Sequence, residues 1–155
     1  MAQSVLLFSF TPPAPYDDYH AGSGGISHTL TATENFLTPI DVTKVVYAAN
    51  AYGSTDEYSS FYNRAWDVSI ELFSAGAWVE VDGCAGSSSS GGSGGCSVSG
   101  TKEGTFIAPV LYPNVTAARW TAWAQANSDH DQRIQMALLQ YDIYVLSVSD
   151  TGYIV

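Results

Sequence analysis

The feature that most constrains the fold of this chain is a series of segments in its second half where apolar and polar residues alternate. Residues 66–72 follow this pattern, residues 74–76 form a short turn, and residues 77–81 continue the pattern. It returns at residues 117–126 and 134–144. Successive side chains of a strand point to opposite faces, so a period of two predicts half-buried β-strands. Their order along the chain predicts two sheets packed face to face.

The first half of the chain adds shorter predicted strands. We expect strands near residues 27–32 and 41–48, followed by a polar, tyrosine-rich loop at residues 50–63. No internal repeat and no convincing helical period is visible. A chain of 155 residues is long enough for one core of this kind. The sequence therefore predicts an all-β fold, a single jelly-roll β-sandwich of about eight antiparallel strands.

Residues 1–25 are expected to form an extended N-terminal arm ahead of a sandwich domain at residues 26–155. Residues 11–15 contain three prolines and must be extended, because each proline restricts the residue before it. Two interpretations of the arm stay open: it docks on a neighbouring subunit, or it is the first strand of the sandwich. The apolar residues that would serve as the assembly arm are Val5, Leu6, Leu7, Phe8 and Phe10.

Two later strands predict local geometry. Four alanines and Trp120 share one face of residues 117–126, and such small side chains imply close approach of a neighbouring layer. In residues 134–144 the apolar phase slips by one residue after Leu138. That slip predicts a β-bulge near Leu138 and Leu139. Trp66 and Trp120 are expected in the core.

Cys84 and Cys96 bracket 11 residues, of which five are serine and five glycine. The pair predicts a disulfide across a flexible loop, with a stabilisation of roughly 3 kcal/mol in the chain-entropy model. This prediction requires an oxidising compartment, and in a reducing cytosol both cysteines would be free thiols. A metal or redox site would need further ligands or a Cys-x-x-Cys spacing, and neither is present.

Composition excludes two classes of partner. The chain has 5 Lys and Arg against 15 Asp and Glu, a formal net charge of -10. Binding a phosphate backbone or an anionic membrane needs basic side chains, so we expect no nucleic acid and no membrane insertion. No signal peptide is visible, since the first lysine is Lys44 and the first apolar run is short. We expect a virion surface or another extracellular location.

In their order and spacing, these elements resemble the galactose-binding-like jelly roll of the discoidin or coagulation-factor C-domain type. The resemblance covers about residues 41–146, but the turn of that family is usually Asp-Gly, whereas here it is Ser74-Ala75-Gly76. The resemblance implies binding of sugars, phospholipid head groups or proteins through loops at one end, so the ligand does not follow from the fold. The elements that carry the resemblance are residues 66–72, Trp78-Val79-Glu80-Val81, Pro109-Val110, Ala117-Ala118-Arg119-Trp120 and residues 134–144.

No catalytic motif is present, and we expect no enzymatic activity. The chain has no Gly-x-Ser-x-Gly elbow, P-loop or His-Glu-x-x-His sequence. Asp67 and Glu71 alternate along a strand, so solvated charges explain them better than a carboxylate pair across a cleft. We expect no cofactor except one candidate, a structural calcium ion on Asp129 and Asp131, because loop carboxylates suit Ca²⁺.

Aromatic residues give the binding signal, because rings stack on sugar faces and anchor protein interfaces. Two functions remain. The first is a structural protein of a large assembly, such as a capsid decoration or phage tail component, with subunits of the same assembly as partners and a homo-oligomeric state. The second is a carbohydrate-binding lectin module. The candidate ligand-binding residues are Tyr52, Tyr58, Phe61, Tyr62 and Trp123.

Overall fold

The computed structural model describes residues 3–56, 62–89 and 92–147. This part of the chain is all-β, with eight antiparallel strands and no helix, which confirms the predicted fold class. It accordingly contains no helix long and apolar enough to cross a membrane. The strands are β1 Ser4–Ser9, β2 Tyr16–His20, β3 Gly24–Thr55, β4 Tyr62–Ser74, β5 Ala77–Ser88, β6 Gly92–Glu103, β7 Tyr112–Ser128 and β8 Gln132–Leu146.

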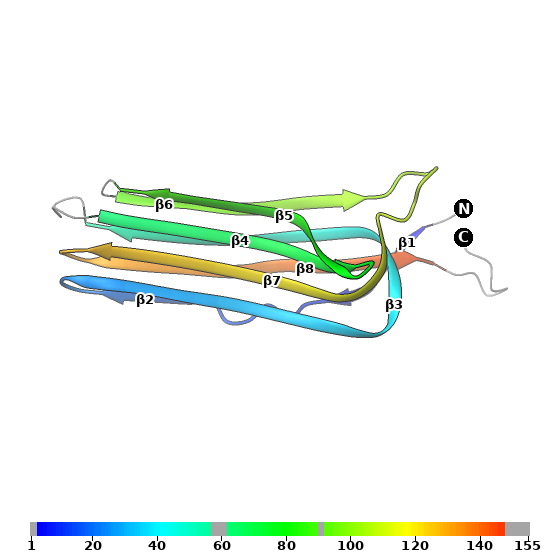
Figure 1. The fold of residues 1–155 in the computed structure, drawn as a ribbon, viewed down its shortest axis with the longest axis horizontal. Coiled ribbons are helices and arrows are strands. Elements are labelled where there is room, and N and C mark those ends of the chain that lie inside the picture. The colour runs from blue at the N-terminus through cyan, green and yellow to red at the C-terminus, as the bar shows by residue number, and fades with distance from the viewer. Residues whose placement is uncertain (1–2, 57–61, 90–91, 148–155) are drawn as a thin grey trace.

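The long strand β3 belongs to both layers of the sandwich (Figure 1). Its first part pairs with β7 continuously up to Asn35 and again at Ile40 and Val42, whereas its second part pairs with β8 from Val42 and with β6 from Lys44 onward. Register shifts between Asn35 and Val42 mark the bend that carries it from one layer to the other. Pro39 lies in this bend, where no ladder hydrogen bond requires its missing N–H. The sequence predicted two separate strands here, which was wrong because the bend keeps strand geometry throughout.

Each layer therefore contains half of β3. The first layer has the order β5, β4, β7 and the N-terminal half of β3, whereas the second has β6, the C-terminal half of β3 and β8. Strands β1 and β2 extend the second layer, since both pair with β8 at successive stretches. Within one chain, the two strands of the arm are therefore edge strands of the second layer, and docking of the arm on a neighbouring subunit stays a prediction.

The core lies between the layers and follows the predicted alternation. The alanines of β7 on the same face as Trp120 are fully buried, as is Trp120 itself. Two tyrosines of the second layer reach across the core to the first. The Tyr141 hydroxyl donates to the Glu71 carbonyl oxygen at 2.6 Å, and the Tyr47 hydroxyl donates to the Asp82 carboxylate at 2.8 Å. Burial, together with Asp82, raises the pKa of Tyr47 to about 12, so it stays a donor.

Two details of backbone geometry agree with the sequence. Ala48 pairs with Gln140 while Ala49 pairs with Leu138, so Leu139 is the extra residue of a bulge, which confirms the predicted position. The β4–β5 hairpin turns through Ala75 and Gly76, whose φ angles of 51° and 86° are both positive. This is the primed turn whose twist matches that of the flanking strands.

The serine- and glycine-rich segment is mostly strand, so its prediction as a flexible loop was wrong. It supplies the ends of β5 and β6, and the Cys84–Cys96 disulfide joins these two strands. The glycines leave room for Trp66, which packs against the core. A Cβ atom at Gly86 or at Gly94 would lie 2.8 Å from an atom of the Trp66 ring. Small residues are needed here for close approach rather than for flexibility.

Overpacking should reveal the close approach of the layers. We expect Ala122→Leu to lower the free energy of unfolding by about 2 kcal/mol, because its side chain is fully buried against the opposite layer. The matched control is Gln125→Leu on the outward face of the same strand, with an expected change within about 0.5 kcal/mol. Urea denaturation measures both, and equal effects would contradict the assigned faces.

The disulfide should stabilise the sandwich at its β5–β6 side. We expect the double variant Cys84→Ser/Cys96→Ser to lose about 3 kcal/mol of unfolding free energy, as loop closure in the unfolded chain predicts. Denaturation with and without reductant measures this. Reductant should shift the wild-type midpoint to that of the variant and leave the variant unchanged. A wild-type midpoint that ignores reductant would refute the role.

Candidate functional site

A shallow groove crosses the outward face of the second layer, in the half near the β7–β8 turn. It consists of three adjoining hollows of about 310, 240 and 300 Å³. Ser54 and Arg133 line both the first and the second hollow, while Tyr52 and Gln135 line both the second and the third. We call it the outer groove and define it by Tyr19, Tyr52, Ser54, Ser93, Arg133 and Gln135.

Strand register brings these residues together. Arg133 of β8 lies opposite Ser54 of β3 on one side and opposite Tyr19 of β2 on the other. One pleat further along, Gln135 lies opposite Tyr52. Because residues two apart on a strand share a face, alternate positions of β2, β8 and β3 form one continuous surface.

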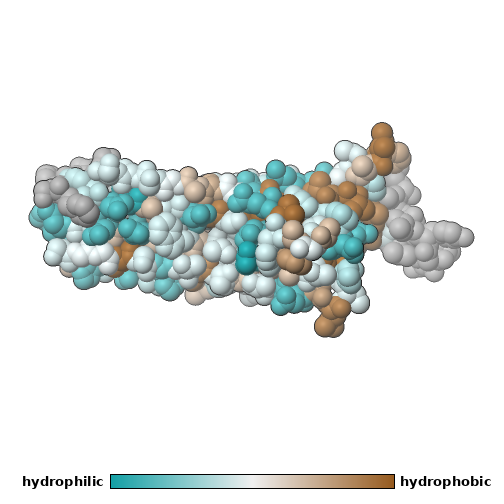
Figure 2. Space-filling view, viewed as in Figure 1, coloured by the Kyte–Doolittle hydropathy of each residue, from teal (hydrophilic) through white to brown (hydrophobic). Residues whose placement is uncertain are grey.

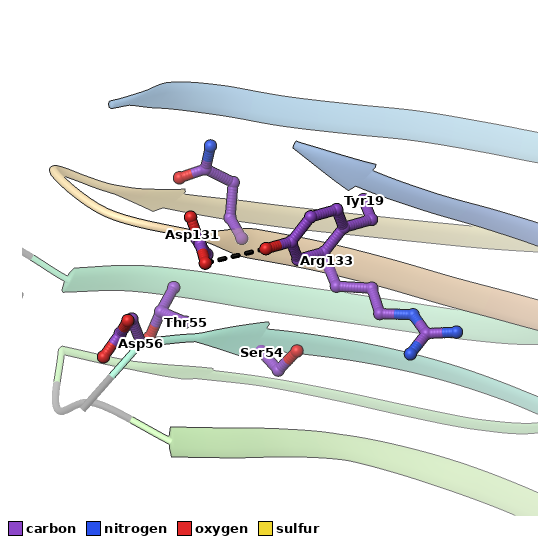
Figure 3. Close-up of a pocket in the computed structure, with 7 residues that line it drawn as sticks. Tyr19, Ser54, Thr55, Asp56, Asp131 and Arg133 are labelled. Atoms are coloured by element: carbon purple, nitrogen blue, oxygen red, sulfur yellow. Dashed lines mark hydrogen bonds between the residues drawn. The ribbon is translucent and has the colours of Figure 1, made fainter. Parts of the chain in front are cut away.

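Two tyrosine rings stand at the outer groove. Tyr52 is 40% exposed, and its ring occupies the space over Gly95 of the neighbouring strand, where a Cβ atom would collide with it. The ring therefore lies over the neighbouring strand and is partly open to solvent. Tyr19 is 58% exposed, and Figure 3 shows its hydroxyl directed at Asp131, to which it donates at 2.7 Å.

The charges of the outer groove are arranged in pairs. The Arg133 guanidinium donates two hydrogen bonds to the Asp17 carboxylate, at 2.8 and 2.5 Å. These bonds hold the pKa of Asp17 below its ordinary value. At one end, Asp131 accepts hydrogen bonds from the Tyr19 hydroxyl and from the Gly22 amide, which lower the pKa of its carboxyl group. Both carboxylates stay charged at neutral pH, and Arg133 is compensated by Asp17.

One hydroxyl at this end is unusual. Thr55 also lines the first hollow but faces inward and is only 6% exposed, and its Oγ1 has no hydrogen-bond partner in the described part of the chain. Leaving a buried hydroxyl unpaired costs about 1–3 kcal/mol. This end of the sandwich therefore contains a buried hydroxyl that has no hydrogen-bond partner in the described part of the chain.

The predicted calcium site is not tested by these observations. Within residues 3–56, 62–89 and 92–147, no group of three or more His, Cys, Asp or Glu side chains is placed to hold a metal ion. Asp131 is already hydrogen-bonded, as described above, and Asp129 lies exposed in the β7–β8 turn. Calcium binding by Asp129 and Asp131 therefore stays a prediction.

Among the described residues, the predicted ligand-binding aromatics do not form one cluster. Tyr52 lies within β3 rather than in the expected loop, and Tyr62 is the first residue of β4. Trp123 lies half-buried on the outward face of the first layer, where Asp67 and Thr29 are its cross-strand neighbours, so Tyr52 and Trp123 face away from each other. Tyr58 and Phe61 lie outside the described residues. Sequence reasoning missed Arg133 and Gln135, although their alternation with buried Ile134 marks them as outward-facing.

A second surface lies at the opposite end of the sandwich, where β1 begins and β8 ends. Figure 2 shows hydrophobic residues gathered around this end, whereas the other end is mostly hydrophilic. In the described part of the chain, nine of the twelve exposed large apolar side chains belong to it. We call it the apolar base and define it by Val5, Leu6, Leu7, Leu37, Trp78, Val79, Phe106, Ile107 and Val110.

The most prominent part of the apolar base is the turn between β6 and β7. The Thr105 amide donates to the Ala108 carbonyl at 3.0 Å, and the Ala108 amide donates back to the Thr105 hydroxyl at 2.9 Å. This closed turn holds Phe106 and Ile107 at its tip, where they are 86% and 93% exposed. Leu37, in the bend of β3, is fully exposed as well.

An apolar hollow of about 310 Å³ adjoins these residues at the base. Leu7 of β1 and Ile40 in the bend of β3 line one part of it. Val110, just before β7, and Val145 of β8 line the rest. Leu7 is the extra residue of a register shift in β1, since Leu6 pairs with Tyr144 and Phe8 with Ile143. The bulge leaves the Leu7 side chain nearly half exposed instead of packed in the ladder.

Comparison with known proteins gives structural similarity only. No protein-family model and no curated protein matches the chain, so the resemblance to galactose-binding-like domains stays a prediction. Among solved structures, the VP2 subviral particle of infectious bursal disease virus is 12% identical, with a TM-score of 0.34. That match covers 89% of this chain and 40% of the viral one. The Gx strain of the same virus gives 10% identity, a TM-score of 0.36, and coverage of 95% and 41%.

The paired carboxylates should make stability depend on acid pH. Hydrogen bonds lower the pKa of Asp17 and Asp131 in the folded state, so the unfolded chain binds protons first as pH falls. Their stabilisation is therefore present above the unfolded pKa near 3.8 and is lost as pH falls through the folded pKa values. Unfolding midpoints between about pH 2 and 6 should fall more steeply for the wild type than for Asp17→Asn/Asp131→Asn. Parallel curves would contradict the pairing.

Proposed function

We propose that this chain is a non-catalytic structural domain of a large protein assembly, held to its neighbours by the apolar base. The single observation that carries the proposal is the concentration of exposed apolar side chains at one end of the sandwich. Isolated exposed apolar residues are common on soluble proteins, whereas a contiguous group marks an interaction surface. The opposite end is mostly hydrophilic (Figure 2).

The energetics of the β6–β7 turn support this role. Fully burying a Phe, Ile or Leu side chain is worth roughly 1.5–3 kcal/mol each. Phe106 and Ile107 of this turn, and Leu37 in the bend of β3, are almost completely exposed. Each would gain most of this burial free energy on contact with a partner. The turn is closed by its own hydrogen bonds, so little ordering entropy opposes its docking.

The partner that we propose is protein, beginning with further copies of this chain. The net charge of -10 opposes anionic membranes, which also attract exposed apolar groups. A virion surface is the setting that we propose, with a capsid decoration or tail component as the type of subunit. The Cys84–Cys96 disulfide supports a location outside a reducing cytosol.

Removing the apolar tip should abolish self-association. We expect the wild-type chain to give a concentration-dependent multiple of 16.5 kDa in light scattering, and Phe106→Ser/Ile107→Ser to give the monomer mass. Leu139→Ser is the matched control, because Leu139 is 59% exposed but lies in the β8 bulge away from the base. It should leave the mass unchanged.

A wild-type monomer at every concentration would overturn self-association through the base. Deleting residues 1–25 is a poor substitute for these point variants, because it removes β1 and β2 and uncovers the edge of β8. An uncovered edge strand pairs with other chains and would create new association.

A second function, carbohydrate binding, is favoured by the outer groove rather than by the base. The outer groove lies on the outward face of the second layer and the apolar base lies at one end of the sandwich, so the two functions do not exclude each other.

A further inference from the structure

We propose that the outer groove is a binding site for neutral carbohydrate, formed by strand residues on the outward face of the second layer. The proposal goes beyond the assembly role, since none of the residues that define the outer groove belongs to the apolar base. It also differs from binding through loops at one end, because Tyr52, Arg133 and Gln135 lie within strands.

The stacking platform is Tyr52. Its ring lies over Gly95 and is partly open to solvent, and a sugar ring presents C–H groups that pack on an aromatic face. Gly95 is what permits this arrangement, because any Cβ atom there would meet the ring and backbone of Tyr52. The backbone of Tyr52 is held on both sides, because β3 pairs with β6 and with β8 at this point.

Polar side chains that can bond to sugar hydroxyls line the same hollow as Tyr52. Gln135, directly opposite Tyr52, offers a carbonyl acceptor and an amide group that already donates one hydrogen bond to Asp17. Ser54 and Ser93 are cross-strand neighbours of each other and add two hydroxyls along the same hollow. A sugar hydroxyl both donates and accepts, so a mixed set of this kind matches it better than a set of one polarity.

The charges favour a neutral sugar over an acidic one. Among the described residues, Arg133 is the one cation that lines the three hollows, and its guanidinium already donates two hydrogen bonds to the Asp17 carboxylate. Asp56 and Asp131 add two more carboxylates at the end of the groove. An anionic sugar would meet uncompensated negative charge in an acidic protein, whereas a neutral one avoids this repulsion.

The dimensions suit an oligosaccharide lying along the sheet. The groove runs along β8 from Arg133 to Ala137, about 13 Å at roughly 3.3 Å per strand residue. It is open to solvent along this length rather than enclosed, so a chain can enter from the side. Figure 3 shows one end of it, where Ser54, Tyr19 and Arg133 come from three different strands.

The test is calorimetric titration of the full chain with neutral tetrasaccharides of glucose, mannose, galactose and N-acetylglucosamine, and with sialyllactose as the acidic probe. We expect at least one neutral probe to bind and sialyllactose to bind at least tenfold more weakly. Tyr52→Ala should weaken the neutral probe at least tenfold, whereas Tyr52→Phe should retain it within about twofold, because stacking needs the ring and not its hydroxyl.

The matched control is Tyr144→Ala, a tyrosine on the same strand as Gln135 whose ring contacts Lys44 outside the groove. It should leave binding unchanged, as should Phe106→Ser/Ile107→Ser at the base. Thermal unfolding of each variant shows whether it is folded. If Tyr52→Ala does not fold, Tyr52→Phe still tests the proposal, because loss of binding in this variant would contradict stacking on the ring. The proposal is overturned if no neutral probe binds at millimolar concentration, or if binding survives in folded Tyr52→Ala.

Discussion

The structure depends on one constraint, which is that β3 must keep its inward residues inward while it passes from one layer to the other. Val42 and Val45 are both fully buried although they are three residues apart, because a register shift against β8 between Val42 and Lys44 changes the phase of the alternation at the end of the bend. Because the same strand carries hydrogen bonds to β7, β6 and β8, neither layer can form completely without the other. This shared strand also contributes to both surfaces, since Tyr52 and Ser54 belong to the outer groove and Leu37 belongs to the apolar base.

Much of the fold could be predicted from residues whose burial leaves a period in the sequence. The alternation at Trp66–Leu72 gave β4 and its hairpin, and the phase slip at Leu138 gave the bulge, because a buried face tolerates no change of register. The Gly/Ser segment was misjudged for the opposite reason. Gly86 and Gly94 are small to admit Trp66, and composition alone cannot distinguish close packing from flexibility.

The candidate site was only partly predictable, because outward-facing positions carry no apolar period. Tyr52 was chosen for its aromatic ring but placed in a loop, since the residues around it are polar and small. Arg133 and Gln135 become part of a site only when the register sets them opposite Ser54 and Tyr52. That register joins residues about 80 positions apart, and local pattern contains no information about it.

The pairing of Ser4 with Leu146 has a mechanical consequence. Strands β1 and β8 are antiparallel and meet at the base, where the Ser147 amide also donates to the Gln3 carbonyl oxygen. A force that pulls these two chain positions apart would load their hydrogen bonds one after another, like a zipper opening, instead of all at once. Tension applied at the base would therefore peel β1 away first, while the disulfide-linked strands β5 and β6 stay unloaded.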